Sequence, residues 1–322
     1  MSNQLIVTES TDPWTNLAME EYLFDTQGEG ATLYLWQNQN TVVIGRNQNA
    51  WKECRVQLLE NEGGRLARRS SGGGAVFHDL GNLNFTFILP RGDYNLLRQF
   101  AVIQRALQTF GIMACISGRN DLALETGEKF SGNAFRFSSD TAMHHGTILI
   151  NADMDKMMRY LAPSKQKMQA KGVDSVRSRV RNLTEVTVDI TIESLIYALT
   201  DAFSQEYGDA ERLQERKMDQ ALIETLRSRY ASWDWRYGKT PLFDISLSHK
   251  FDWGELELLL TCQHGCIEQV TVFTDAMDET LADRLSRTMH HVVYTPNVLA
   301  KCVASMEDAP AGLADWLAEL VI

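Results

Sequence analysis

Cysteine is scarce in this sequence, and long apolar runs are missing from it. The five cysteines are Cys54, Cys115, Cys262, Cys266 and Cys302. Because their number is odd and small for a chain of this length, a fold stabilised by several disulfides is excluded and a reducing cytoplasm is favoured. No stretch approaches the roughly 18 consecutive apolar residues that span a bilayer, and the segment MSNQLIVTESTDPW lacks the basic and apolar regions of a secretory signal. We therefore expect a cytoplasmic protein without a membrane segment.

Positive charge is also in deficit. Lys and Arg number 31 against 42 Asp and Glu, which leaves a net charge of −11. Such a molecule repels nucleic acid and anionic membranes, and it carries no RNP-type or KH-type motif, so we expect neither partner. An anionic ligand must then find a local basic site. The stretch 156–181 is a candidate, because its eight Lys or Arg against one Asp give a local charge of +7.

The composition and patterning that are present indicate a globular α+β protein. Hydrophobic residues make up 44% and charged residues 23% of a chain long enough for two domains. Apolar periodicity predicts helices at 12–25, 51–62, 94–110, 191–206, 215–231, 278–291 and 295–306. Strands are predicted at 4–8, at 32–37 and 41–47 as a hairpin, in short runs from 65 to 151, and in two runs within 250–275 joined at His264-Gly265.

This order of elements predicts mixed, mainly antiparallel sheets flanked by helices. The aromatic, turn-rich segment SWDWRYGKTPLF precedes the last group of strands and is a reasonable domain boundary. We expect a larger domain at 1–240 and a small α+β accessory domain at 241–322. Internal repeats are not apparent.

The most informative segment is RRSSGGGAVFHDLGN at 68–82. Three consecutive glycines between strands let main-chain N–H groups close on a phosphate or nucleotide, and Arg68 and Arg69 add positive charge. No Gly-Lys-Ser/Thr follows and no GxGxxG opens a helix, so the segment is neither a P-loop nor a dinucleotide fingerprint. A sharp turn with solvated arginines explains the glycines equally well.

Three other short motifs place polar residues where a ligand could lie. EKFSGNAFR at 128–136 sets Lys129 in a strand beside a Ser-Gly pair. A compact ammonium there suits phosphate and carboxylate oxygens, although a strand lysine is more often simply solvated. GRNDL at 118–122 and HHGT at 144–147 either orient a ligand or are structural. CQHGC at 262–266 has no second ligand pair at matching spacing, so a hairpin turn is favoured over a zinc site.

Taken in order, five motifs resemble those of lipoate-protein ligases of the bacterial long form, in the biotin/lipoate ligase superfamily. They are RRSSGGGAVFHDLGNLNFTF, GRNDL, EKFSGNAFR, HHGTILIN and KGVDSVRSRVRNL. With DPWTNLAMEE near the start and VTVFTD in the C-terminal part, the resemblance covers nearly the whole chain. It implies that fold and a two-step ligase, which converts lipoate and ATP into lipoyl-adenylate and pyrophosphate and then acylates one lysine of a lipoyl domain.

The resemblance also implies ligands and partners. ATP is a substrate that acts with Mg²⁺, and octanoate is an alternative to lipoic acid. The acceptors are the lipoyl domains of E2 subunits in 2-oxoacid dehydrogenase complexes and the glycine cleavage H protein. The enzyme itself is expected to be a monomer.

Roles are implied position by position. Lys129 is the catalytic residue and touches both the nucleotide and lipoate. The implied ATP and lipoyl-AMP contacts are Lys129, Arg69, Gly74, Ala75, Val76 and Phe77, and the supporting positions are Ser71, Gly73, Asn82, Asp121 and His145. Asp121 is a candidate Mg²⁺ contact, although the metal ligands stay unknown. Because attack of a carboxylate on an α-phosphate is opposed by like charge, fixed cations and backbone donors matter more than a general base.

Two further features have competing interpretations. The lipoate tail needs an apolar tunnel, and the candidates by residue type are Trp36, Val43, Phe77 and Phe85, each of which is at least as well explained as core. The run 156–181 is either a solvated surface or, as the resemblance implies for KGVDSVRSRV, a stretch that closes over the adenylate and excludes water. Its charge would also steer an acidic acceptor domain.

Other functions stay open. An octanoyl or lipoyl transferase that works through a thioester needs an activated cysteine, yet Cys54 and Cys115 lie outside the motifs. A biotin ligase would carry a GRGR-type loop in place of SSGGGAV. A non-catalytic homologue that binds lipoate or a nucleotide should have lost Lys129 or the glycine loop, and both are present.

Overall fold

The computed structural model describes residues 3–48, 50–118, 121–161, 180–237, 245–263 and 266–320. Their internal contacts define two compact units. The first comprises Met1–Ile44, Ala50–Arg69 and Ala75–Arg236, and the second comprises Gly45–Asn49, Ser70–Gly74 and Tyr237–Ile322. Two short N-terminal segments therefore cluster with the C-terminal residues. The domain boundary expected at residue 240 lies within 238–244, outside the described residues.

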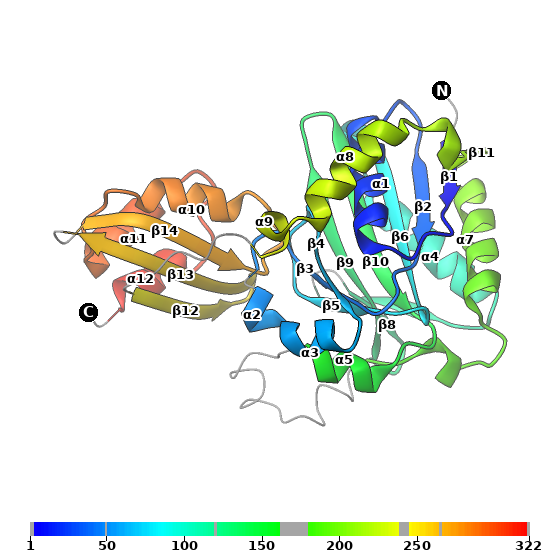
Figure 1. The fold of residues 1–322 in the computed structure, drawn as a ribbon, viewed down its shortest axis with the longest axis horizontal. Helices are drawn as coiled ribbons and strands as arrows, with labels where there is room; N and C mark the ends of the chain where they lie inside the picture. The colour runs from blue at the N-terminus through cyan, green and yellow to red at the C-terminus, as the bar shows by residue number, and fades with distance from the viewer. Residues whose placement is uncertain are drawn as a thin grey trace. The chain divides into compact units, whose positions relative to one another are not determined.

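The described residues of the first unit build an eight-stranded sheet (Figure 1). Its order is β11-β1-β2-β6-β10-β9-β8-β7. The strands are β1 Asn3–Val7, β2 Thr32–Trp36, β6 Asn82–Pro90, β7 Ala114–Ser117, β8 Asp121–Leu124, β9 Lys129–Phe137, β10 Thr141–Leu149 and β11 Ala210–Arg212. Strand β1 pairs in parallel with β11 and β2, and every other pair is antiparallel.

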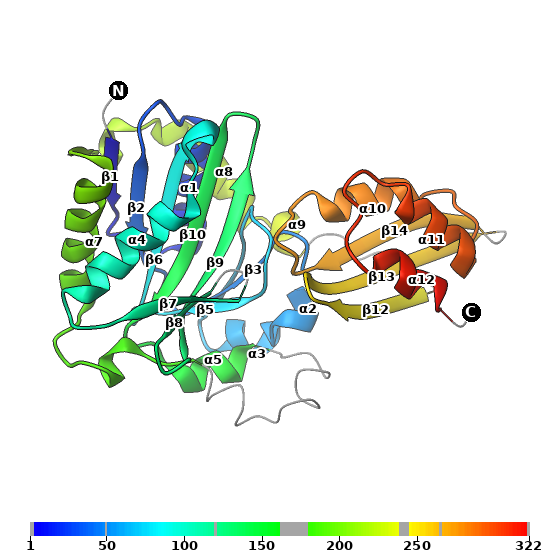
Figure 2. The ribbon, with the colours of Figure 1, turned by 180° about the vertical axis from the view of Figure 1, so that it is seen from behind.

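Helices cover both faces of this sheet (Figure 1 and Figure 2). Helices α1 Pro13–Asp25 and α8 Gln220–Ala231 lie on one face, and α4 Leu96–Gln108 and α7 Ile192–Tyr207 lie on the other. Because side chains alternate along a strand, neighbouring residues enter two different cores. The core on the α1 side includes Tyr34, Trp36, Ile88 and Met143, and the core on the α4 side includes Leu33, Phe85, Phe87 and Ile148.

Shorter elements complete the first unit. They are the helices α2 Ala50–Glu53, α3 Val56–Asn61, α5 Met154–Tyr160 and α9 Trp233–Arg236, and the 3₁₀ turns η1 Arg91–Asp93, η2 Leu183–Glu185 and η3 Glu215–Lys217. Sequence signals explain the ends of the main helices. Helix α1 has Pro13 in its first turn and an Asp12 side chain that accepts from the Thr15 N–H, while the Asn95 side chain caps α4.

The predicted hairpin of 32–37 and 41–47 is wrong. Strand β3 Thr41–Ile44 lies between β4 Arg65–Arg68 and β5 Val76–His78 in a separate three-stranded sheet. Strand β2 already pairs with β1 and β6 on its two sides. Both β2 and β3 are buried along their whole length, so their sequences show no alternation that would identify a partner. The turn between them leads the chain from one sheet to the other.

Three antiparallel strands and three helices form the C-terminal part of the second unit, as far as the chain is described. The strands are β12 Ile245–Phe251, β13 Gly254–Gln263 and β14 Cys266–Thr274, in that order, and the helices are α10 Leu281–Met289, α11 Pro296–Ala304 and α12 Leu313–Ala318. They share one core, which includes Leu258, Leu285, Leu299 and Leu313. Strand β12 adds to the two predicted strands, and exposed residues alternate along it, the period-two signal of a strand. The predicted turn at His264-Gly265 lies outside the described residues.

These units confirm the predicted α+β class with mainly antiparallel sheets flanked by helices. Among the described helices, none combines the length and apolar character needed to cross a membrane.

Candidate functional site

A strip of polar side chains crosses one face of the large sheet. Directly paired residues of antiparallel strands point to the same face, and Thr86 pairs with His145 while Asn84 pairs with Thr147 and Trp36. Asn82, Asn84 and Thr86 alternate along β6 and are at most 1% exposed. Asn82 Oδ1 and Asn84 Nδ2 are buried and find no hydrogen-bond partner among the described residues. Because such orphaned atoms are rare in proteins, the strip is a candidate ligand-binding surface.

Lys129 and Asp121 form an accessible ion pair at the beginning of two adjacent strands. Lys129 starts β9, Asp121 starts β8, and Lys129 Nζ lies 2.7 Å from Asp121 Oδ1. Their side chains are 38% and 32% exposed, so the ammonium is open to a ligand. Gly132 lies beneath it, because a Cβ built at Gly132 would lie 3.0 Å from Lys129 Nζ. The Ser-Gly pair beside Lys129 thus leaves room for the lysine to lie across the sheet.

This arrangement gives a prediction for Gly132→Ala. A methyl group at Gly132 would press on the flexible end of Lys129, so the ammonium must move by a few tenths of an ångström while the strand stays in place. We expect roughly tenfold lower activity in a reaction that depends on this ammonium, since small misplacements of a reacting or binding group are costly, and a melting temperature close to that of the wild type. Gly92→Ala is the control, because a Cβ there meets no atom within 4 Å. Equal rates for the two variants would contradict this account.

His145 belongs to a buried hydrogen-bond network that the sequence analysis missed in part. His145 Nδ1 lies 2.7 Å from Glu20 Oε1, and the Thr86 hydroxyl donates to the same oxygen at 2.7 Å. The Trp36 indole N–H in turn donates to the Thr86 hydroxyl at 3.0 Å. The network fixes the Trp36 ring on the site face. Its sequence signal is Glu20, a carboxylate in the middle of the helix 13–25, where it is 1% exposed.

His78, the last residue of β5, places an imidazole in the three-stranded sheet β4-β3-β5. The side-chain amide of Asn38 donates to His78 Nδ1 at 3.1 Å, so the neutral ring carries its proton on Nε2. That nitrogen is buried without a partner among the described residues. Burial, helped by the nearby positive charge of Arg69, lowers the pKa of His78 to about 3. At neutral pH His78 is therefore an uncharged donor.

The two arginines before the glycine loop serve different purposes. The Arg68 guanidinium donates to the carbonyl oxygens of Trp235 and Arg236 at the end of α9, at 3.0 and 2.8 Å, and burial lowers its pKa to about 10. It therefore remains charged but is used to hold α9. Arg69 is 7% exposed, and its Nη1 donates to the Val43 carbonyl oxygen at 3.4 Å. Of the pair, Arg69 is the one whose charge lowers the pKa of the buried His78.

The glycine loop Ser70–Gly74 belongs to the second unit. Its glycines have distinct structural reasons. A Cβ at Gly72 would overlap the Ala276 carbonyl oxygen, Gly73 has a φ of 93°, and a Cβ at Gly74 would meet nothing within 4 Å. The Gly73 N–H donates to the Ala276 carbonyl oxygen at 3.2 Å, and the Ser71 carbonyl accepts from the Arg46 N–H at 2.9 Å. Gly74 is thus the most open of the three positions.

The remaining predicted contacts differ in their exposure. Ala75 and Val76 are partly exposed at the end of the loop, and Val76 packs against the core on the α1 side. Phe77 is 1% exposed and packs on Tyr160, with ring centroids 5.6 Å apart. Phe85 lies in the core on the α4 side, against His144, on the opposite face of the sheet from Thr86. Phe85 is therefore a core residue, which is the alternative that its residue type left open.

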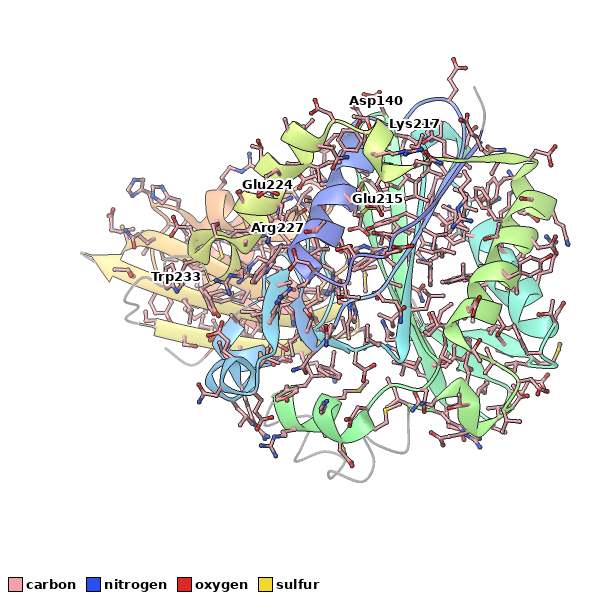
Figure 3. The ribbon with its side chains drawn as sticks, turned by 45° about the vertical axis from the view of Figure 1, so that its right-hand side comes forward. Asp140, Glu215, Lys217, Glu224, Arg227 and Trp233 are labelled. Atoms are coloured by element: carbon pink, nitrogen blue, oxygen red, sulfur yellow. The ribbon has the colours of Figure 1, made fainter. Side chains whose placement is uncertain are left out.

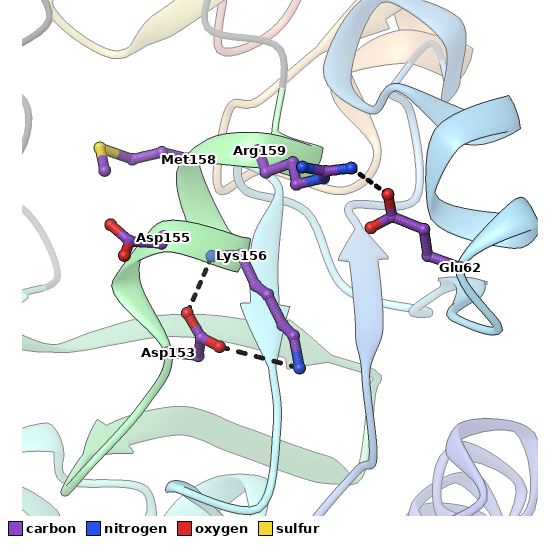
Figure 4. Close-up of a pocket in the computed structure, with 6 residues that line it drawn as sticks. All are labelled: Glu62, Asp153, Asp155, Lys156, Met158 and Arg159. Carbon is purple, nitrogen blue, oxygen red and sulfur yellow. Dashed lines mark hydrogen bonds and ion pairs between the residues drawn. The ribbon is translucent and has the colours of Figure 1, made fainter.

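The basic run 156–181 is only partly described, because 162–179 lie outside the described residues. Lys156 and Arg159 line a surface pocket between α5 and α3, where Lys156 pairs with Asp153 at 3.7 Å and Arg159 pairs with Glu62 (Figure 4). None of the predicted site residues lines this pocket. The described part of the chain contains no group of three or more His, Cys, Asp or Glu that could hold a metal ion.

Comparison with known proteins decides the family. Residues 12–204 match the model of the lipoyl protein ligase A/B catalytic domain, and residues 240–314 match the bacterial lipoate protein ligase C-terminus. The chain is 43% identical over 304 residues to lipoate-protein ligase A of Psychrobacter cryohalolentis, covering 91% of this chain and 89% of that one. This chain belongs to the lipoate-protein ligase family. The family membership predicted from the five ordered motifs is thereby confirmed, and the protein is a ligase.

Solved structures of lipoate-protein ligases have the same fold. P. falciparum LipL1 in complex with lipoate has a TM-score of 0.85 and 29% identity, with 98% of each chain covered. A bi-partite lipoate protein ligase from Thermoplasma acidophilum has a TM-score of 0.67 and 26% identity over 76% of this chain and all of that one. A lipoate-protein ligase A bound with ATP has a TM-score of 0.63 and 25% identity over 74% of this chain and 99% of that one.

Proposed function

We propose that this lipoate-protein ligase family member activates lipoate with ATP and transfers the lipoyl group to a protein lysine. In the first step a lipoate carboxylate oxygen bonds to the α-phosphorus of ATP, and the bond to the β-phosphate breaks to release pyrophosphate. In the second step the neutral ε-amine of the acceptor lysine bonds to the acyl carbon, the bond from that carbon to AMP breaks, and one amine proton is lost to solvent. Relatives that were solved with lipoate or with ATP support both substrates. Octanoate, which shares the carboxylate and an apolar tail, is an alternative to lipoate.

The observation that carries this proposal is the accessible Lys129 ammonium at the edge of the buried polar strip. Joining two anions requires a fixed cation where their charges meet. Lys129 supplies it: we assign the ammonium to hold the α-phosphate and the acyl oxygen together, and so to stabilise the charge that develops in both steps. Asp121 orients Lys129 before the substrates arrive, since its carboxylate lies 2.7 Å from Nζ.

Arg69 and the loop that follows it are the proposed nucleotide contacts, with Gly74, Ala75, Val76 and Phe77. Ser71 and Gly73 support the loop backbone, through the bonds to Arg46 and Ala276. Mg²⁺ would neutralise the triphosphate, and Asp121 is the carboxylate we propose for it because it lies beside the lysine that faces the phosphates. The roles of Asn82 and His145 are to line the strip, where their buried side chains position the acyl end of lipoate.

The apolar tail of lipoate is assigned to the α1 side of the large sheet. Trp36 and Val43 belong to the core on that side, and the hydrogen bond from Trp36 to Thr86 fixes the indole ring. Aromatic and aliphatic walls with a few fixed polar groups are typical of small-molecule sites. We therefore propose 1–240 as the catalytic domain and 241–322 as the accessory domain.

A thioester-forming transferase fits the described thiols poorly. Cys54 is 1% exposed, and burial raises the pKa of its thiol to about 12, so it is protonated and inert at neutral pH. Cys115 is exposed on β7. A Cys115→Ser variant with unchanged lipoyl transfer would agree with the ligase assignment.

The proposed acceptors are lipoyl domains of E2 subunits and the glycine cleavage H protein. The lipoylation system of Thermoplasma acidophilum consists of the bi-partite ligase and its E2 lipoyl domain, which supports the first of these acceptors. We also propose that the protein acts in the cytoplasm as a monomer. The test of the acceptor is incubation of the protein with an apo lipoyl domain, lipoate and ATP. Mass spectrometry should show one added lipoyl group on a single lysine, and none when ATP is left out. Equal modification without ATP would contradict the proposal.

Salt dependence tests whether the basic run steers the acceptor. Lys156 and Arg159 pair with carboxylates, and we assign the attraction for an acidic acceptor to the net charge of +7 of the whole run. We expect the KM for the apo lipoyl domain to rise severalfold between about 50 and 300 mM salt, because the Debye length shrinks, while the KM for lipoate changes less. If the acceptor KM were constant over this range, the steering role would be wrong.

A further inference from the structure

The backbone of Lys129 is held by two residues from a distant part of the sequence. Val180 forms a parallel β-bridge with Lys129, and the Arg181 N–H donates to the Lys129 carbonyl oxygen at 2.9 Å. The ladder between β8 and β9 is irregular at this point, since its register shifts between Leu122 and Ala123, and Ala123 is the partner of Lys129. The hydrogen bond from Arg181 therefore supports the start of β9 at the place where the pairing of β8 and β9 is irregular.

The Arg181 guanidinium bridges two carboxylates. Its Nη1 lies 3.5 Å from Glu128 Oε1, and its Nε lies 3.6 Å from Glu185 Oε2. Nη2 also donates to the Glu185 carbonyl oxygen at 3.3 Å. Glu128 directly precedes Lys129 in the chain. These contacts tie the residue before Lys129 to the 3₁₀ turn η2.

The residues that follow Arg181 are anchored in the first unit. The Asn182 side chain accepts from the Ala152 N–H and donates to the Ala152 carbonyl oxygen, both at 2.9 Å. Leu183 is fully buried, and the Thr184 N–H donates to the Ile150 carbonyl oxygen at 3.0 Å. Arg181 is thus followed by residues that are anchored in the first unit. Through its contacts with Glu128 and Lys129, this anchoring also holds the start of β9.

We propose that Arg181 is a positioning residue for Lys129. It touches neither lipoate nor nucleotide; it sets the place of the Lys129 backbone, and so the place of the ammonium over Gly132. The inference rests on the proposed function, in which that ammonium contacts the reacting phosphate and acyl oxygens. Displacements of about 1 Å can lower a rate as much as a hundredfold, so a loosened strand end should be visible in kcat.

The test replaces Arg181 and measures lipoate-dependent ATP–pyrophosphate exchange in the full chain. Arg181→Gln removes the guanidinium and keeps the backbone N–H. We expect kcat to fall about tenfold, with the KM values for ATP and lipoate within about twofold of wild type. Arg181→Lys keeps an ammonium for Glu128 and should recover most of the rate. Glu128→Gln should reproduce the loss, and the double variant with Arg181→Gln should be no slower than either single variant.

The matched control is Arg227→Gln. Arg227, labelled with Glu224 in Figure 3, also bridges two carboxylates, Asp12 at 3.1 Å and Glu224 at 3.3 Å. Its side chain is 36% exposed, close to the 33% of Arg181. It contacts no residue placed in the site. We expect both variants to lower the melting temperature by similar small amounts, and Arg227→Gln to keep the wild-type kcat.

The outcomes separate the alternatives. If Arg181→Gln and Arg227→Gln have equal kcat, Arg181 is only a structural residue and the inference is wrong. A loss confined to the KM for ATP would also overturn it, because Arg181 would then contact the nucleotide directly. A wild-type protein without any exchange would instead refute the proposed function, and this inference with it.

Discussion

Replacing Lys129 by alanine is expected to lower the rate of lipoyl-AMP formation by about a hundred- to a thousandfold while the protein stays folded. The rate falls because the fixed cation between carboxylate and α-phosphate is lost, and removing one such preorganised charge or donor costs about that much. The fold survives because the Lys129 side chain is 38% exposed and its one described ion pair is with the equally accessible Asp121, and such pairs contribute little to stability. Lipoyl-AMP is measured by chromatography after a single turnover.

The control for this variant is Lys217→Ala. Lys217 is an exposed lysine of η3, on the face that Figure 3 shows, and it lies outside the motifs. We expect wild-type rates and a wild-type melting temperature. Near-normal adenylation by Lys129→Ala would contradict the assignment of the catalytic residue, whereas a large drop in its melting temperature would show that Lys129 is part of the fold.

Mild acid is expected to destabilise the protein through two buried histidines. Burial lowers the pKa of His144 far below its usual 6.5, and burial together with Arg69 lowers the pKa of His78 to about 3. The unfolded chain binds a proton at each histidine near pH 6.5, and the folded chain does not, so stability is lost as pH falls below that value. Each contributes about 1.4 kcal/mol per pH unit. From pH 7 to 5.5 we expect the free energy of unfolding to fall by about 2.5 kcal/mol.

Burial explains why His144 stays neutral, because it penalises the charged ring. The ring lies in the core on the α4 side, with Nδ1 2.7 Å from the side-chain amide group of Gln99 and Nε2 2.9 Å from that of Asn133. The measurement is urea unfolding at several pH values between 5 and 7, where most carboxylates remain ionised. His144→Gln should roughly halve the slope of stability against pH, whatever it does to stability at pH 7. An unchanged slope would mean that His144 takes up a proton in the folded protein.

Motif order was the strongest information in the sequence. The five motifs identified the family through their order and spacing, and Lys129 and Asp121, which belong to two of them, do lie together. The structure also gives a reason for the glycine at position 132, because the Lys129 side chain lies over it. Such local relations are encoded in a few neighbouring residues and can be recognised without a structure.

The face to which a strand residue points was not readable from residue type. Phe85 and Thr86 are neighbours on β6, yet one packs against α4 and the other binds Glu20. That difference depends on strand register, which tertiary pairing sets. The same holds for Arg68 and Arg69. Arg68 holds α9, while the charge of Arg69 acts on His78. Charge alone assigns Arg68 and Arg69 to the same role.

The most direct test of the central claim is ATP–pyrophosphate exchange with the unmodified protein. Labelled pyrophosphate should enter ATP when lipoate is present and should not when lipoate is left out, since only formation of an acyl-adenylate makes the first step reversible from pyrophosphate. Octanoate should support the same exchange. Exchange that does not depend on the acid, or no exchange in the presence of lipoate, ATP and Mg²⁺, would contradict the account.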